Sequence, residues 1–160
     1  MSIASAGIGA RKIYEIKDTL PCGFADLRDD SVQGGHKFLQ KLEGAWQSGG
    51  NRFNKSGECL LAVDDGGVFA AIGGINIDPY LNNPDMGRIR HLYVHSGFRR
   101  RGLASAILTA LEKHAVLHFT QLTLRTHSPE AGLFYEALGF HAVRDNAYVT
   151  HRKGLVDQST

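Results

Sequence analysis

The sequence has few cysteines and little excess charge of either sign. Its two cysteines, Cys22 and Cys59, form no CxxC or other metal-binding spacing. Two isolated cysteines do not make a disulfide framework, so we expect a domain that folds without bridges in the reducing cytoplasm. The formal net charge is only +2. That value argues against a nucleic-acid-binding protein, because such proteins need many Lys and Arg contacts to phosphates.

Long apolar runs and paired histidines are also missing. No stretch reaches the roughly 18 to 20 apolar residues that cross a bilayer, so no membrane partner is expected. The segment "MSIASAGIGARK" carries its charges after its apolar residues, unlike a signal peptide, and we interpret residues 1–11 as a flexible tail. The eight histidines include no HExxH pair, so no metal is predicted. The length of 160 residues favours one domain over residues 1–160.

Hydrophobic periodicity predicts an alternation of strands and helices. The expected order is strand, helix, three strands, helix, strand, helix and two strands, and most of residues 22–47 lack a regular pattern. A strand–helix–strand connection joins parallel strands, whereas hairpins are antiparallel. We therefore predict an α/β (α+β) domain with a mixed, mostly antiparallel sheet of about seven strands and helices on both faces. The most clearly marked elements are a strand over 12–17, a helix around 38–46, a hairpin turn at 64–67, a loop over 78–87, a strand with a bulge over 88–94, a helix over 102–117, a strand over 121–126, a helix between Ser128 and Gly139, and a turn at 145–146.

The stretch "GFRRRGLASAIL" (residues 97–108) joins the strand 88–94 to the following helix. A helix begins with about four backbone N–H groups that lack partners, and no Ser, Thr, Asp or Asn stands here to cap them. These amides, the helix dipole and the arginines favour an anion, and Gly102 and Ala104 leave room for it. The spacing fits neither a Walker loop nor a G-x-G-x-x-G fingerprint. The pattern predicts a site for phosphate or pyrophosphate.

The pattern Arg99-x-x-Gly102-x-Ala104 resembles the [QR]-x-x-G-x-[GA] signature of the GNAT superfamily of acetyl-CoA-dependent N-acetyltransferases. Its surroundings support the resemblance, which covers about residues 58–152. "LYV" precedes the signature, and "AGLFYEALGF" follows about 30 residues later with the family's spacing of Ala131, Tyr135, Glu136, Gly139 and Phe140.

The resemblance implies that the strands 88–94 and 121–126 splay apart and bind acetyl-CoA between them. Tyr135 would lie near the CoA sulfur and protonate the departing thiolate as general acid. Ser128 occupies the position of a family Asn that contacts pantetheine. The other residues implied in cofactor binding are Leu92, Tyr93 and Val94 for the pantetheine arm, and Arg99, Arg100, Arg101, Gly102, Leu103, Ala104 and Ser105 for the pyrophosphate.

The resemblance also implies direct attack of a neutral amine on the thioester, without a covalent enzyme intermediate. The Glu that serves some relatives as general base corresponds to Arg88, which cannot take that role. His91 is a candidate base because histidine titrates near neutrality; an ordinary strand histidine, a water chain or an amine already neutral when bound are the alternatives. Asp78 and Asp85 either serve turn chemistry or attract a cationic amine.

The acceptor is the least specified part of the expected reaction. The sequence has no acidic patch to hold a basic tail, which favours the primary amine of a small molecule. A protein or peptide acceptor and a non-catalytic acyl-CoA sensor are the alternatives. Dimers are frequent in the family, so a homodimer is possible.

Overall fold

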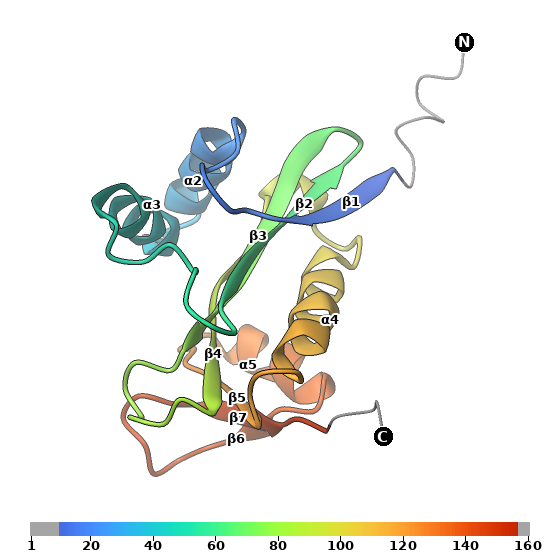
Figure 1. Cartoon of the computed structure of the whole chain (residues 1–160). Coiled ribbons are helices and arrows are strands. Elements are labelled where there is room, and N and C mark those ends of the chain that lie inside the picture. The colour runs from blue at the N-terminus through green and yellow to red at the C-terminus, as the bar shows by residue number, and fades with distance from the viewer. Residues whose placement is uncertain (1–9, 157–160) are drawn as a thin grey trace.

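The computed structural model describes residues 10–156, which form one sheet with helices on both faces (Figure 1). The predicted tail lies outside the described residues up to residue 9, and Arg11 already belongs to the first strand. Within residues 10–156, no helix combines the length and the apolar character that a bilayer crossing requires. The elements are β1 (Arg11–Glu15), α2 (Phe24–Gln33), α3 (Phe38–Ser48), β2 (Cys59–Asp65), β3 (Val68–Ile77), β4 (Met86–Val94), the 3-10 helix η1 (Ser96–Phe98), α4 (Leu103–Ala115), β5 (Gln121–Leu124), α5 (Pro129–Ala137), β6 (His141–Ala142) and β7 (His151–Gly154).

The sheet has seven strands in the order β1-β2-β3-β4-β5-β7-β6. Strands β4 and β5 run parallel, and every other neighbouring pair is antiparallel. The predicted fold class is therefore confirmed. The parallel pairing is short, because only Met86–Arg88 pair with Gln121–Thr123, and from there to Val94 β4 pairs with β3 but not with β5. The two strands thus separate at the end of β4 that leads into η1 and α4.

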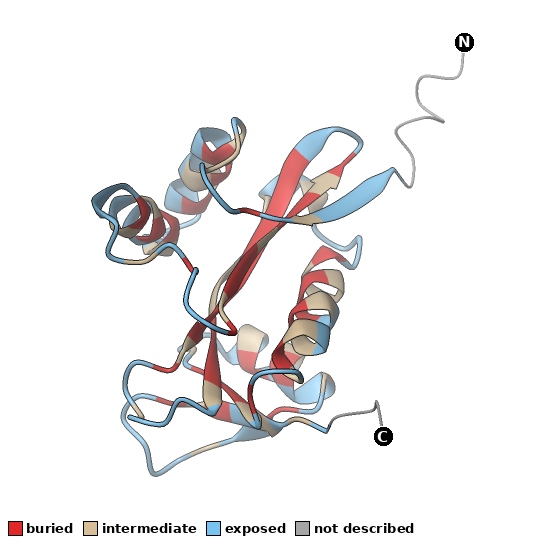
Figure 2. Cartoon of the chain, in the orientation of Figure 1, coloured by how far each residue is buried: buried red, intermediate tan, exposed pale blue. Residues whose placement is uncertain are grey.

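Each face of the sheet has its own hydrophobic core. Helices α4 and α5 cover one face, where Leu103, Ile107 and Leu111 of α4 are at most 1% exposed. Helices α2 and α3 cover the other face, and the buried parts of the strands lie between the two layers (Figure 2). The i, i+4 spacing of the three α4 residues matches the apolar stripe that the sequence predicts. Burying each such side chain contributes about 1.5–3 kcal/mol.

Helix α2 is the main element that the sequence pattern does not reveal. Its buried positions are Phe24, Leu27 and Ser31, so a serine occupies the place where a third apolar residue would complete the stripe. The Ser31 hydroxyl is satisfied by the carbonyl of Arg28 at 2.7 Å, which allows it to be buried. Other differences lie at element ends. Strand β4 begins at Met86 rather than residue 88, and β5 ends at Leu124 rather than residue 126.

A β-bulge bends β4 as the sequence predicts. The register with β3 shifts between Ile72 and Gly74, and His91 adopts a positive φ of 59°. Gly73 and Gly74 make room on both faces opposite this bulge. A Cβ at Gly73 would lie 2.9 Å from Ile107 of α4, and one at Gly74 would lie 2.7 Å from the Phe53 ring. The bulge turns β4 away from β5 and so contributes to the separation of the strands.

Candidate functional site

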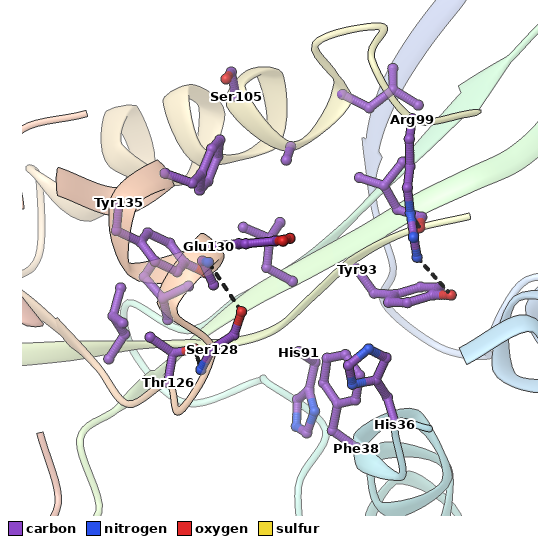
Figure 3. Close-up of a pocket in the computed structure, with 18 of the residues that line it drawn as sticks. His36, Phe38, His91, Tyr93, Arg99, Ser105, Thr126, Ser128, Glu130 and Tyr135 are labelled. Atoms are coloured by element: carbon purple, nitrogen blue, oxygen red, sulfur yellow. Dashed lines mark hydrogen bonds between the residues drawn. The ribbon is translucent and has the colours of Figure 1, made fainter. Parts of the chain in front are cut away.

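A cleft of about 970 Å³ opens where β4 and β5 separate, and we call it the β4–β5 cleft. The β4 edge from Leu92 to Val94 forms one wall, and Leu124–Ser128 with the start of α5 form the other. The start of α4 closes one end, and His36 and Phe38 contribute from the α2–α3 side (Figure 3). The two strands that the sequence pairs in parallel therefore supply both walls.

The first turn of α4 presents free backbone amides at the cleft. Gly102 is the N-cap with φ 76°, no side chain caps the helix, and the first bond runs from the Ala106 N–H to the Gly102 carbonyl at 3.0 Å. Leu103, Ala104 and Ser105 follow and all line the cleft. Amides at this position point out of the helix N-terminus, where its dipole is positive. The arrangement suits a phosphate group.

The three arginines before α4 do not act alike. Arg99 and Arg100 line the cleft, and Arg100 adopts a positive φ of 64°. Arg101 points elsewhere, since its guanidinium lies 3.5 Å from the Asp65 carboxylate and 5.0 Å from the centre of the Phe98 ring. This placement corrects the expectation that the Arg101 side chain contributes to the anion site.

Asp30 of α2 fixes the loop that carries Arg99. Its carboxylate accepts hydrogen bonds from the Tyr93 hydroxyl at 2.5 Å, the Ser96 hydroxyl at 2.5 Å and the Ser96 N–H at 2.9 Å. Burial opposes ionisation, but these bonds prevail and lower the pKa of Asp30 to about 2. The Tyr93 hydroxyl in turn accepts from Arg99 at 3.4 Å (Figure 3). Asp30 was not predicted as part of the site.

Tyr135 lies on the α5 side of the cleft, and the residue is 8% exposed. The rings of Phe134 and Phe140 hold it, with centroids 5.2 and 5.4 Å away. Burial raises the pKa of Tyr135 well above its usual value. The phenol therefore keeps its proton at neutral pH and can act as a donor.

His91 lies on the opposite wall, stacked against Phe38 at 6.3 Å between ring centroids (Figure 3). Its Nδ1 is buried, and no residue of the described chain gives it a hydrogen-bond partner. Burial, with a smaller effect of the Arg90 charge, lowers the pKa of His91 to about 3. So weak a base retains a proton poorly near neutrality, which argues against His91 as the candidate general base and leaves the alternatives open.

Ser128 and several unpredicted residues complete the wall near α5. Ser128 is the N-cap of α5, as predicted, and its hydroxyl accepts from the Ala131 N–H at 3.2 Å. Thr126, His127 and Glu130 also line the cleft. Their position at the end of β5 and the start of α5 is the only signal that could have indicated them.

Asp78 and Arg88 form a buried pair beside β5. The Asp78 carboxylate lies 3.5 Å from the Arg88 guanidinium and accepts from the Thr123 hydroxyl at 2.5 Å. The Asp78 side chain has no exposed surface. The structure thus excludes the expected alternative in which Asp78 attracts a cationic amine, and gives it a structural role instead.

Comparisons with known proteins agree with this geometry. The family model described as the acetyltransferase (GNAT) domain matches residues 55–142. The fold is similar to that of a protein from Exiguobacterium sp. 255-15 that is described as an acetyltransferase. The two sequences are 24% identical, the match covers 90% of this chain and 93% of that chain, and the TM-score is 0.79.

Two further solved structures share the fold. One is yncA, an assigned acetyltransferase from Salmonella typhimurium solved with its cofactor acetyl-CoA, at 14% identity, 95% and 98% coverage and a TM-score of 0.64. The other is an assigned acyl-CoA N-acyltransferase from Klebsiella pneumoniae, at 21% identity, 92% and 99% coverage and a TM-score of 0.63. No curated protein matches the sequence. The family match over more than half of the chain, on a fold of this kind, shows that the protein belongs to the GNAT acetyltransferase family.

Proposed function

We propose that this protein transfers an acetyl group from acetyl-CoA to the primary amine of a small molecule by direct attack. Membership of the GNAT family supports acyl transfer from CoA, and the Salmonella structure contains acetyl-CoA. The observation that carries the proposal is the β4–β5 cleft, which has an uncapped helix N-terminus at one end and the Tyr135 phenol on its wall.

The residues of the cleft fit an acyl-CoA. The amides of Leu103, Ala104 and Ser105 and the charges of Arg99 and Arg100 suit the pyrophosphate. The edge of β4 from Leu92 to Val94 has no neighbouring strand on the side of the cleft within residues 10–156, so its backbone groups can pair with the amides of the pantetheine arm. Bound there, acetyl-CoA supplies the thioester whose acyl carbon the amine attacks.

The reaction balances without a covalent enzyme intermediate. The amine nitrogen forms a bond to the acyl carbon, and the C–S bond breaks with its electron pair leaving on sulfur. The Tyr135 phenol gives its proton to that thiolate. The attacking nitrogen loses one proton to solvent, and the Tyr135 phenolate regains one proton from solvent, which restores the enzyme. Backbone N–H groups on the edge of β4 stabilise the charge that the carbonyl oxygen gains. The products are the N-acetylated amine and free CoA.

The charges around the cleft favour a small acceptor over a basic peptide. Among the residues of the described chain that line the cleft, Glu130 is the one acid, whereas Arg99, Arg100 and Arg125 are cations. The described lining of the cleft therefore lacks the acidic surface that would hold a lysine-rich tail.

Two assays test the proposal. Calorimetric titration should show acetyl-CoA binding, and a thiol-release assay over a panel of amines should show turnover. Tyr135→Phe should lower kcat by about 100-fold, because positioned general acids contribute about 10²–10⁴ in rate, while the Kd for CoA stays unchanged.

The matched control is Tyr14→Phe, since Tyr14 lies on β1 and does not line the cleft. It should turn over like the wild type. Full activity of Tyr135→Phe would refute the acid role, and absence of acetyl-CoA binding would refute the proposed function.

A further inference from the structure

A second pocket lies beside His91, and we call it the α3–β2 pocket. It has a volume of about 420 Å³ and is formed by the end of α3, the segment between α3 and β2, and the ends of β3 and β4. His91 lines both this pocket and the β4–β5 cleft, so the two spaces border the same residue. The pocket is therefore a neighbour of the cleft in which acyl transfer is proposed.

The lining of the α3–β2 pocket is cationic. It includes four cations and one acid within the described chain: Lys41, Arg52, Lys55, Arg90 and Glu58. The Glu58 carboxylate is already occupied. It accepts from the Asn76 side chain at 3.0 Å, the Ile77 N–H at 2.9 Å and the Lys55 N–H at 3.2 Å. The four cations of the pocket therefore outnumber its one carboxylate, and that carboxylate is held by neutral donors rather than by direct contact with any of their charged groups.

Arg90 differs from the other cations of the pocket in the surroundings of its charge. Its guanidinium is half-buried, and its hydrogen bond runs to the neutral side-chain oxygen of Asn76 at 3.4 Å. No carboxylate of residues 10–156 forms an ion pair with it. Arg88, two residues earlier on the same face of β4, shows the contrast, because it has Asp78 as its partner.

A guanidinium withdrawn from water without an anion is costly, and a ligand anion would relieve that cost. Burial lowers the pKa of Arg90, which agrees with a charge that the protein itself compensates incompletely. The wall beside Arg90 is firmly built. The side-chain amides of Asn51 and Asn76 hydrogen-bond to each other at 2.8 and 3.0 Å. These two bonds hold the Asn76 side-chain oxygen in its position beside Arg90.

We propose that the acceptor is an amine that also carries a carboxylate, and that Arg90 binds this carboxylate in the α3–β2 pocket. The inference rests on the proposed function and names its substrate class. A carboxylate matches the planar donor fork of one guanidinium. With the carboxylate at Arg90, the rest of the acceptor would lie along His91, the residue that lines both spaces. The cationic pocket also favours the uncharged form of that amine, which is the form that attacks.

The test compares amino acids with their own carboxamides as acceptors for acetyl-CoA in the thiol-release assay. With the wild-type chain, kcat/KM for the carboxamide should be lower by about 30-fold or more, mainly through KM. Arg90→Gln should lower kcat/KM for the carboxylate by a similar factor, leave the carboxamide nearly unaffected, and keep the wild-type Kd for CoA. Arg144→Gln is the control, because Arg144 is exposed and lines neither space.

The outcomes separate this inference from the proposed function. Amine acetylation with equal use of acids and carboxamides would overturn the inference and leave the proposed function intact. Preference for amines that bear a phosphate over those that bear a carboxylate would also overturn it. Absence of CoA binding and of turnover with every amine would overturn both. The comparison of acceptors needs only the wild-type chain, so it decides whether the acceptor carries a carboxylate even if Arg90→Gln fails to fold.

Discussion

Asp30 offers the sharpest test of how helix α2 supports the cleft. Its carboxylate accepts three hydrogen bonds from Tyr93 and Ser96 and is 12% exposed. In Asp30→Asn the charge is lost, and the new NH₂ group faces donors rather than acceptors. A hydrogen bond to a charged group contributes about 1.5–3 kcal/mol, so we expect a loss of about 2 kcal/mol in the free energy of unfolding at pH 7. For a domain of this size that corresponds to a fall of about 4–8 °C in Tm.

Calorimetry of Asp30→Asn and Asp29→Asn measures this effect. Asp29 is adjacent in sequence, but its side chain is 60% exposed. Within the described chain its one ion pair is with Arg28. Exposed pairs of this kind contribute about 0–1 kcal/mol, so the control should melt close to the wild type. Equal Tm values for the two variants at pH 7 would refute the assigned role of Asp30.

The same variant has a pH signature of known sign. The pKa of Asp30 falls from its usual 3.8 to about 2, so the folded protein binds fewer protons here than the unfolded chain. The stabilisation is therefore fully present above pH 3.8 and declines as the pH falls towards 2. The gap in Tm between wild type and Asp30→Asn should be smaller at pH 3 than at pH 7. An unchanged gap would contradict the attribution to ionised Asp30.

Asp30→Asn should also weaken CoA binding, because Arg99 is held through Tyr93. The Kd for CoA should rise several-fold, while kcat at saturating acetyl-CoA changes little. Titration of the folded variant below its Tm separates this effect from the loss of stability. An unchanged Kd would show that the position of Arg99 does not depend on helix α2.

Four further substitutions separate the proposed anion site from the scaffold. Arg99→Ala should raise the Kd for CoA by about tenfold, whereas Arg101→Ala, whose side chain lies outside the cleft, should not; equal effects in titration would contradict the assignment. Gly102→Ala places a Cβ in open space, but the backbone there has φ 76°. The substitution should therefore cost about 1–2 kcal/mol of stability and raise the Kd for CoA. An unchanged Kd would show that CoA does not need to approach the backbone closely at this residue. Gly74→Ala brings a Cβ to 2.7 Å from the Phe53 ring and should cost about 1–3 kcal/mol by thermal melting with the Kd for CoA unchanged; wild-type stability would contradict the tight packing opposite the bulge.

The features that the sequence predicts correctly are those written in neighbouring residues. The apolar stripe of α4, the Ser128 cap with Pro129 after it, and the positive φ of Gly139 behind α5 each depend on a few positions close together in the chain. The lack of a capping side chain before α4 is an equally local feature. In the structure no side chain caps α4, as the sequence predicts. Periodicity and capping report backbone geometry directly, which is why they survive without any knowledge of tertiary contacts.

Helix α2 shows where this local information ends. A serine at its third buried position interrupts the apolar pattern, and only the packing of Phe24 and Leu27 under the sheet reveals the helix. The direction of the Arg101 side chain depends likewise on Asp65 of β2. Three adjacent arginines look equivalent in sequence, and their roles separate only when distant strands place partners beside them.

The sequence by itself predicted the order of the elements except for helix α2, and it predicted the parallel pairing of β4 with β5. The family resemblance implied that this pair splays apart, and the anion site before α4 stays a prediction. The tertiary structure alone decided what surrounds that site. It brings Asp30 into contact with Ser96, 66 residues away. It also pairs Asp78 with Arg88, whereas Arg90 bonds only to the neutral Asn76 side chain among the described residues. The physical reason is that ionisation and ion pairing depend on burial and on neighbours through space. Neither quantity has a period along the chain that a sequence could display.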